Sequence, residues 1–196
     1  VYISARKESE CAATAAELSK GGGTCIAIAA DLSTEAGCKA LADAIAAREA
    51  KLHVLVNNAG ANWGAPLAEF PDSGWDKVLA LNVKGPFHMT KMLLPLLEKA
   101  GTAGDPARVI NIGSIDGLKV PFLETYSYSA SKAAVHHLTK VLAVQLAPKH
   151  ITVNAVAPGP FESKMMAVTL ERFKDAIVAA CPLGRIGEPE DMAGVA

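Results

Sequence analysis

Short runs rich in valine and isoleucine alternate along the chain with longer segments of helical spacing. The apolar runs are continuous, as is typical of strands that are buried on both faces. They cover residues 1–4, 24–30, 52–56, 108–112 and 151–157. The helical segments cover about 8–20, 34–49, 73–99, 126–147 and 164–179, and a last one begins near 188. This alternation predicts an α/β fold, in which a doubly wound, Rossmann-type parallel sheet carries helices on both faces.

Polar residues, glycine or proline follow the end of each expected strand. The segments are Ala5-Arg6-Lys7, Asp31-Leu32-Ser33, Asn57-Asn58-Ala59-Gly60, Gly113-Ser114 and Pro158-Gly159. The carboxyl ends of parallel strands meet at one edge of the sheet, and doubly wound folds bind their ligands at that edge. The pattern therefore predicts one ligand site assembled from five strand ends.

The composition indicates a single globular domain, 1–196, and argues against several classes of function. Of the 196 residues, 51% are hydrophobic and 20% are charged, which is a globular balance. The 19 basic and 20 acidic residues give no charge excess for nucleic acid or an anionic membrane surface. No apolar run approaches the roughly 18 residues of a membrane span.

The cysteines, the histidines and the chain ends each support one further expectation. The four cysteines and five histidines show no metal-ligand spacing, so we expect free thiols and no metal site. Free thiols favour a reducing compartment, and we expect a cytoplasmic protein. The chain begins at Val1 inside an expected strand and ends in a helical pattern without a cap. We therefore expect a piece of a longer domain, with the first and last strands missing.

Tyr128 and Lys132 are the first candidates for chemistry. They lie four residues apart on an expected helix, so they share one face. A neighbouring ammonium favours the phenolate and lowers the pKa of a tyrosine, which makes the pair a plausible general acid. Tyr126 has Ala130 at the same spacing, so the spacing selects Tyr128. Taken alone, the pattern also fits a surface lysine beside a packed ring.

Three other positions fit both a functional and a structural interpretation. Ser114 ends a strand, where its hydroxyl can donate to a substrate carbonyl, and no neighbouring histidine makes it a nucleophile. Asn82 is polar inside an otherwise apolar helix, which also fits local backbone bonding or a kink. The NNAG stretch at 57–60 lets a ligand approach the backbone at Gly60, or is an ordinary tight loop.

The ends of the first two strands carry opposite charges. Arg6 follows the first strand, where a dinucleotide fold can use an arginine for a 2′-phosphate. It also fits a solvated charge cluster with Lys7. Asp31 follows the second strand and can accept from an adenine amino group. It can equally cap the next helix, as can Ser33.

The chain resembles the short-chain dehydrogenase/reductase family in the order and spacing of its motifs. These are NNAG (57–60), Asn82, Ser114, Tyr128-x-x-x-Lys132 and Pro158-Gly159. The resemblance covers essentially all of the chain and implies NADPH-dependent reduction of a carbonyl. Tyr128 would protonate the carbonyl oxygen, and Lys132 would hold the nicotinamide ribose and lower the pKa of Tyr128. Ser114 would orient the carbonyl, and Asn82 would hold a water of a proton relay.

The resemblance also implies the cofactor site. Arg6 matches the position that NADP-preferring members use for the 2′-phosphate. The other cofactor residues are Asp31 at the adenine with Leu32 beside it in the chain, Asn57, Ala59 and Gly60, Pro158, Gly159 and Ser163 near the nicotinamide, and Tyr128 and Lys132 themselves. The family's glycine-rich phosphate loop and first strand are expected ahead of Val1, and its last strand after Ala196.

Within the family, the chain resembles the 3-oxoacyl-[acyl-carrier-protein] reductases. The stretches LVNNAGANWGAPL and PARVINIGSI look closest to the branch associated with rhamnolipid biosynthesis. This favours a 3-oxoacyl thioester as substrate, while a sugar, steroid or small ketone, or an inactive truncated or scaffold relative, remains open. Arg108 and Lys149 match the basic positions that receive acyl carrier protein in the bacterial fatty-acid reductases. The resemblance further implies a homo-tetramer or homo-dimer, paired through helices 126–147 and 73–99.

Overall fold

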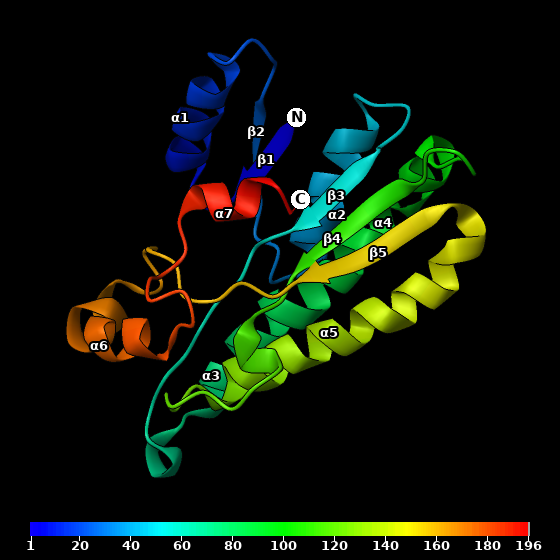
Figure 1. Cartoon of the computed structure of the whole chain (residues 1–196). Coiled ribbons are helices and arrows are strands. Elements are labelled where there is room, and N and C mark those ends of the chain that lie inside the picture. Colours follow the sequence, from blue (N-terminus) through cyan, green and yellow to red (C-terminus); the bar gives the residue numbers. More distant parts are fainter. Residues whose placement is uncertain (196) are drawn as a thin grey trace.

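The computed structural model describes residues 1–195 and contains the expected alternation of strands and helices (Figure 1). The strands are β1 (Tyr2–Ala5), β2 (Ile26–Ala29), β3 (Val54–Asn57), β4 (Ala107–Ile112) and β5 (Ile151–Val156). The α-helices are α1 (Glu8–Ser19), α2 (Glu35–Ala46), α3 (Asp72–Leu79), α4 (Gly85–Ala100), α5 (Tyr126–Leu146), α6 (Ala167–Ala180) and α7 (Pro189–Ala193). Every expected strand is present, and its boundaries differ from the prediction by a few residues.

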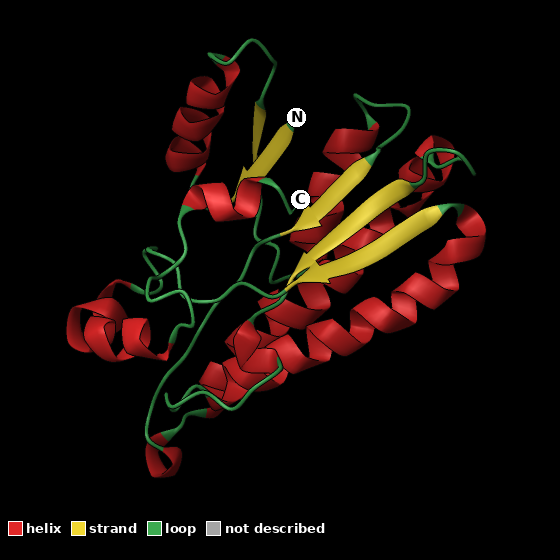
Figure 2. Ribbon diagram, in the orientation of Figure 1, coloured by secondary structure: helices red, strands yellow, loops and turns green. Residues whose placement is uncertain are grey.

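All strand pairs are parallel, and they form two sheets (Figure 2). β1 pairs with β2, and β4 lies between β3 and β5. Within residues 1–195 no strand bonds to both β1 and β3. A doubly wound order places the first strand of the fold between its second and fourth strands, and the break falls at that place. The consequence is visible on β3, where Val54 and Val56 are 44% and 47% exposed.

The core lies between the three-stranded sheet and three helices, α2, α4 and α5. One apolar cluster joins buried residues of α2, such as Leu41, to Met89 and Leu93 of α4. A second joins the end of α4 at Leu97 to β4, β5 and the end of α5. On the other side of the strands, α1 packs against β1 and β2 (Figure 2). Across residues 1–195 no helix is both long enough and apolar enough to cross a membrane.

The segment expected as one helix over 73–99 is interrupted by a π-helical turn, Ala80–Lys84, between α3 and α4. A turn of this kind inserts an extra residue into a helix, and it frequently marks a functional site. Gly85 lies just after it and faces the carbonyl of Leu32, because a Cβ there would come within 2.9 Å of that oxygen. Asn82 lies in this turn, and its side chain bonds to Ala61 in the loop after β3.

Candidate active site

Tyr128, Lys132 and Ser114 come together at the carboxyl edge of the three-stranded sheet. Ser114 follows β4 within two residues and begins a short 3-10 turn, Ile115–Gly117, that packs against α5. Gly117 permits the close approach, because a Cβ there would lie 2.5 Å from the backbone carbon of Lys132. Figure 1 shows α5 passing the tips of the β4 and β5 arrows. The strand ends and the first turns of α5 therefore form one site.

The Ser114 hydroxyl lies close enough to Tyr128 to influence the pKa of its phenol. Ser114 is 7% exposed, and its Oγ accepts the backbone N–H of Asp116 at 3.1 Å. Burial raises the pKa of Tyr128, a hydrogen bond with Ser114 lowers it, and the charge of Asp116 adds a smaller increase. The net pKa of Tyr128 is raised, so the side chain is held as the neutral, proton-bearing phenol.

Lys132 is buried beside this tyrosine. It is 5% exposed, its Nζ donates to the carbonyl of Ile112 at 2.6 Å, and it lies 5.6 Å from the centre of the Tyr128 ring. Burial lowers the pKa of Lys132 to about 8. The structure thus gives the opposite direction to the predicted lowering of the Tyr128 pKa, because burial of the phenol outweighs the other influences on it.

Asn82 ties the loop after β3 to α5. Its Oδ1 accepts the backbone N–H of Ala61 at 2.8 Å, and its Nδ2 donates to the carbonyl of Ala61 and to Ser131 Oγ, both at 2.9 Å. Ser131 Oγ in turn donates to the carbonyl of Tyr128 at 2.7 Å. Both amide protons of Asn82 are therefore in use, and only its oxygen has capacity left for a water.

The side chain of Asn57 is buried and hydrogen-bonded to neighbouring elements of the fold. Its Nδ2 donates to Asn111 Oδ1 at 2.9 Å and to Thr90 Oγ1 at 3.4 Å. Asn111 continues the chain of bonds by donating to Thr139 Oγ1 at 2.9 Å. That Asn57 lines the cofactor stays a prediction, and its side-chain amide is already used within the fold. These bonds join β3 to β4 and α4, and Asn111 extends them to α5.

The family model for short chain dehydrogenases matches residues 1–173 of this chain. The chain belongs to the short-chain dehydrogenase family. It is 48% identical over 198 residues to the rhamnolipids biosynthesis 3-oxoacyl-[acyl-carrier-protein] reductase of Pseudomonas aeruginosa, a match that covers 100% of this chain and 77% of that protein. The 3-oxoacyl-[acyl-carrier-protein] reductase of Thermotoga maritima is 36% identical over 157 residues, which cover 80% of the chain and 62% of that protein.

A solved structure from the same family agrees closely in its backbone. The Pseudomonas aeruginosa RhlG/NADP active-site complex matches with a TM-score of 0.95 at 47% identity, over 100% of this chain and 77% of that one. The arrangement of strand ends and of α5 described above is therefore shared with a family member whose structure contains NADP.

The ends of β1 and β2 form a second, exposed cluster of this short-chain dehydrogenase. Asp31 Oδ1 accepts from the backbone N–H and the hydroxyl of Ser33, at 3.0 and 2.7 Å. These bonds and, more weakly, the charge of Arg6 hold the pKa of Asp31 below its usual value. Neither Asp31 nor Ser33 caps α2, because Thr34 does so by accepting from Gly37 at 3.0 Å. Arg6 and Asp31 thus lie near one another, and both are exposed.

The remaining predicted cofactor residues lie in several different places in the fold. Leu32 packs against the first apolar cluster, and Ala59 is exposed in the loop after β3. Pro158 follows β5, and its carbonyl accepts from Ile115 at 3.2 Å, which brings the Pro158-Gly159 turn next to Ser114. Ser163 lies further along, where its Oγ accepts from Met166 in a local turn.

Tyr126 has a different environment from Tyr128. Its hydroxyl donates to Glu124 at 2.9 Å, and its ring contacts Phe70 edge-on at 5.5 Å. The first contact is to the loop ahead of α5, and the second joins the start of α5 to Phe70, which lies just ahead of α3. This agrees with the selection of Tyr128 by spacing.

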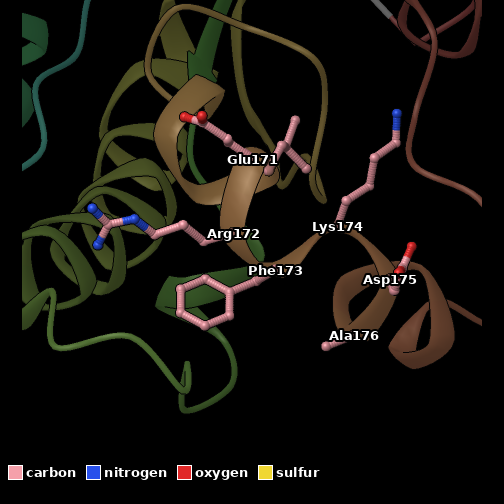
Figure 3. A pocket seen from close by; sticks show the side chains of 7 residues that line it. Glu171, Arg172, Phe173, Lys174, Asp175 and Ala176 are labelled. Carbon is pink, nitrogen blue, oxygen red and sulfur yellow. The ribbon is translucent and has the colours of Figure 1, made fainter.

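The segment after β5 approaches the site from outside through α6. Figure 3 shows the side chains that line a hollow along this helix, in which the Phe173 ring points away from Lys174 and Asp175. The backbone of Phe173 is non-helical, at φ −132° and ψ 16°, and its ring meets Phe122 edge-on at 5.7 Å. Because Phe122 precedes Tyr128 by only six residues, this contact connects α6 to the active-site loop. The hollow itself contains none of the residues expected to act in catalysis.

Several supporting residues carry no motif that could have revealed them. Asn111 and Ser131 are buried and bonded to the predicted residues Asn57 and Asn82, and the buried Thr139 is bonded to Asn111. In each of these three bonds the two residues lie at least 28 positions apart along the chain, so no local pattern marks the pairs. His136 is different, because it stands four residues after Lys132, and the helical spacing that selected Tyr128 could also have selected it.

Proposed function

We propose that this chain carries the catalytic part of an NADPH-dependent carbonyl reductase that acts on 3-oxoacyl thioesters. The observation that carries the proposal is the neutral Tyr128 phenol held against Ser114, with the buried ammonium of Lys132 one helical turn away. The substrate class is supported by the two relatives described above, which are 3-oxoacyl-[acyl-carrier-protein] reductases. The cofactor is supported by the NADP complex of the structural relative.

Tyr128 acts as the general acid in this reaction. Ser114 Oγ donates a hydrogen bond to the substrate carbonyl and places its oxygen beside the Tyr128 hydroxyl. NADPH, when bound, supplies the hydride that the carbonyl carbon accepts. As negative charge develops on the oxygen, Tyr128 gives it a proton, and the ketone becomes an alcohol. The ammonium of Lys132 then stabilises the phenolate, because opposite charges attract strongly in a site that excludes water.

The residues present fit a dinucleotide. Gly60 leaves space beside Lys132, since a Cβ there would lie 3.8 Å from Nζ and 3.6 Å from Asn82 Oδ1. Lys132 uses one proton for Ile112 and keeps two for ribose hydroxyls. Arg6 would hold the 2′-phosphate that distinguishes NADPH from NADH, and Asp31 would accept from the adenine amino group.

An acyl chain would find an apolar surface beside Tyr128. The loop that leads into α5 exposes Leu118, Val120 and Phe122, at 67%, 93% and 67%. Across from this loop, the ring of Phe173 adds a second apolar wall. Exposed apolar side chains gathered at one place commonly mark a binding surface.

Acyl carrier protein and a second copy of the chain are the partners of this proposal. Arg108 and Lys149 would receive the carrier, and in the free chain they pair with Asp105 and Glu98. Arg108 lies at the amino end of β4, about 20 Å along the strand from Ser114. A homo-oligomer paired through α4 and α5 would bring other copies near that edge. The exposed Val141 and Val144 on α5 support such a pairing.

NADPH oxidation by the full-length protein tests the function. We expect kcat/KM for N-acetylcysteamine 3-oxoacyl thioesters to exceed that for sugar, steroid and small ketones by about tenfold or more. Faster reduction of a sugar or steroid would overturn the substrate class but leave the reductase in place. If no ketone supports NADPH oxidation, the proposed function is wrong. For the carrier, Arg108→Ala and Lys149→Ala should raise the KM of the carrier-linked thioester and leave the KM of the N-acetylcysteamine thioester unchanged.

A further inference from the structure

His136 lies on the face of α5 that carries Tyr128 and Lys132. It follows Lys132 by four residues and Tyr128 by eight, so the three side chains occupy successive turns. Its ring Nε2 lies 3.0 Å from the carbonyl oxygen of Ser114 and 3.5 Å from the backbone nitrogen of Ser114. We assign the ring proton to Nε2, because a carbonyl oxygen can only accept and the contact to it is the shorter of the two.

Gly113 makes room for the imidazole. A Cβ at Gly113 would lie 2.4 Å from Cε1 and 2.6 Å from Nε2 of His136, far inside van der Waals contact. Only glycine therefore lets the ring rest on the backbone between β4 and Ser114. Since this environment would pack an apolar side chain equally well, what the imidazole adds is the N–H.

Two side chains of α5 thus hold alternate carbonyls at the end of β4. Lys132 holds the carbonyl of Ile112 and His136 holds the carbonyl of Ser114. Between these two anchors, Gly113 donates to Val156 of β5 at 2.8 Å. The backbone from which the Ser114 hydroxyl projects is therefore bonded to a neighbouring helix and a neighbouring strand.

We propose that His136 is a positioning residue that holds the Ser114 hydroxyl in its catalytic orientation through the backbone of Ser114. The proposal rests on the proposed function, because Ser114 is the group that orients the substrate carbonyl there. His136 touches neither substrate nor cofactor in this role. Its loss should lower kcat, because Ser114 would no longer meet the carbonyl oxygen and Tyr128 at the required distance.

Two substitutions in the full-length protein separate the N–H from the packing. His136→Leu keeps an apolar side chain and removes the donor, and we expect kcat to fall about five- to tenfold with the dissociation constant of NADPH unchanged. His136→Gln places an amide N–H near the position of Nε2 and should restore kcat to within about twofold of the wild type. The exposed neighbour His137 is the matched control, and His137→Leu should leave kcat unchanged. A His136→Leu enzyme with wild-type kcat, or equal losses in the Leu and Gln variants, would overturn the proposal.

Gly113→Ala provides a second test through the same contact. In an otherwise wild-type protein, Gly113→Ala should displace the imidazole of His136 and lower kcat about as much as His136→Leu does. In a protein that already carries His136→Ala, the imidazole no longer fills this space. Adding Gly113→Ala should then lower kcat little further. Additive losses would mean that the two residues act independently and would overturn the proposal.

Amide hydrogen exchange gives a readout that needs no turnover. Peptides spanning residues 113–117 should exchange faster in His136→Leu than in the wild type, and His136→Gln should restore the protection. Unchanged exchange in His136→Leu would contradict the anchoring of Ser114 even if no ketone is reduced. Conversely, a wild type that reduces no ketone but shows this exchange pattern would overturn the proposed function and leave the anchor in place.

Discussion

The ends of β3, β4 and β5 and the ends of β1 and β2 hold their polar side chains in opposite ways. Around the ends of β3, β4 and β5, the side chains of Asn82, Asn111 and Lys132 are at most 5% exposed. Each of them donates a hydrogen bond to a partner on another element. At the ends of β1 and β2, Arg6 and Asp31 are exposed, and they interact only through their opposite charges. Proton transfer needs reacting groups placed within fractions of an ångström, whereas attraction between a cation and a phosphate acts over a longer range.

The difference predicts separable effects of substitution. Changes at the β3–β5 ends should alter the rate of the chemical step and the stability of the fold, because buried groups lose bonds that water does not replace. Changes at the β1–β2 ends should alter cofactor affinity and leave the rest of the protein intact. The following expectations test this division, beginning with the largest effect.

Tyr128→Phe removes the proton donor itself. We expect kcat for NADPH oxidation to fall about a thousandfold, while the dissociation constant of NADPH, measured by fluorescence titration, changes little. Tyr126→Phe is the matched control, because it loses only a bond to the exposed Glu124, and it should stay near wild-type activity. Turnover of Tyr128→Phe within tenfold of the wild type would remove Tyr128 from the mechanism.

Lys132→Met tests the energetic cost of the buried ammonium. Burial lowers the pKa of Lys132 from 10.5 to about 8, so between these pH values the unfolded chain binds more protons than the folded one. The free energy of unfolding of the wild type should therefore rise with pH across this window. Relative to Lys132→Met, the gain from pH 7 to pH 10.5 should be about 3 kcal/mol, measured by urea denaturation. If the difference in the free energy of unfolding between the two proteins does not change with pH, burial does not lower the pKa of Lys132.

Arg6→Ala tests recognition at the exposed edge. We expect the KM for NADPH to rise about tenfold or more, while the KM for NADH and the stability stay unchanged, because the arginine would contact only the 2′-phosphate. Lys7→Ala is the control, since Lys7 is paired with Glu10 at 2.8 Å. Equal effects on both cofactors would mean that Arg6 does not recognise the phosphate.

Phe173→Ala tests a smaller effect at a third position, which belongs to the proposed acyl surface. Loss of the edge-on contact with Phe122 should raise the KM for long-chain 3-oxoacyl thioesters about fivefold. The KM for the shortest thioester should stay within about twofold, because a short chain does not reach the ring. A uniform increase at every chain length would assign Phe173 to the folding of α6 rather than to acyl binding.

Local patterns were enough for the secondary structure, and they favour Tyr128 over Tyr126 as the proposed acid. The strands and most helices follow from runs and spacings of neighbouring residues, because hydrogen bonding and side-chain direction in these elements repeat over a few positions. The same local geometry separates Tyr128 from Tyr126. The family resemblance added the roles of Ser114 and Asn82.

Interactions between distant segments were beyond any such pattern. The family resemblance assigned Asn57 to the cofactor, and only the pairing of β3 with β4 places Asn111 where it accepts from the Asn57 amide. The direction of the Tyr128 pKa depends on how deeply the phenol is buried, which is a property of the packed loop and helix together.

The sequence by itself determined the alternating strands and helices and the spacing that puts Tyr128 and Lys132 on one helix face, since both depend on short-range periodicity. Only the tertiary structure decided that the strands form two sheets, that Asn82 sits on a π-helical turn and that His136 reaches Ser114. Each of these depends on a contact between segments far apart in the chain, and such a contact exists only after the elements have packed.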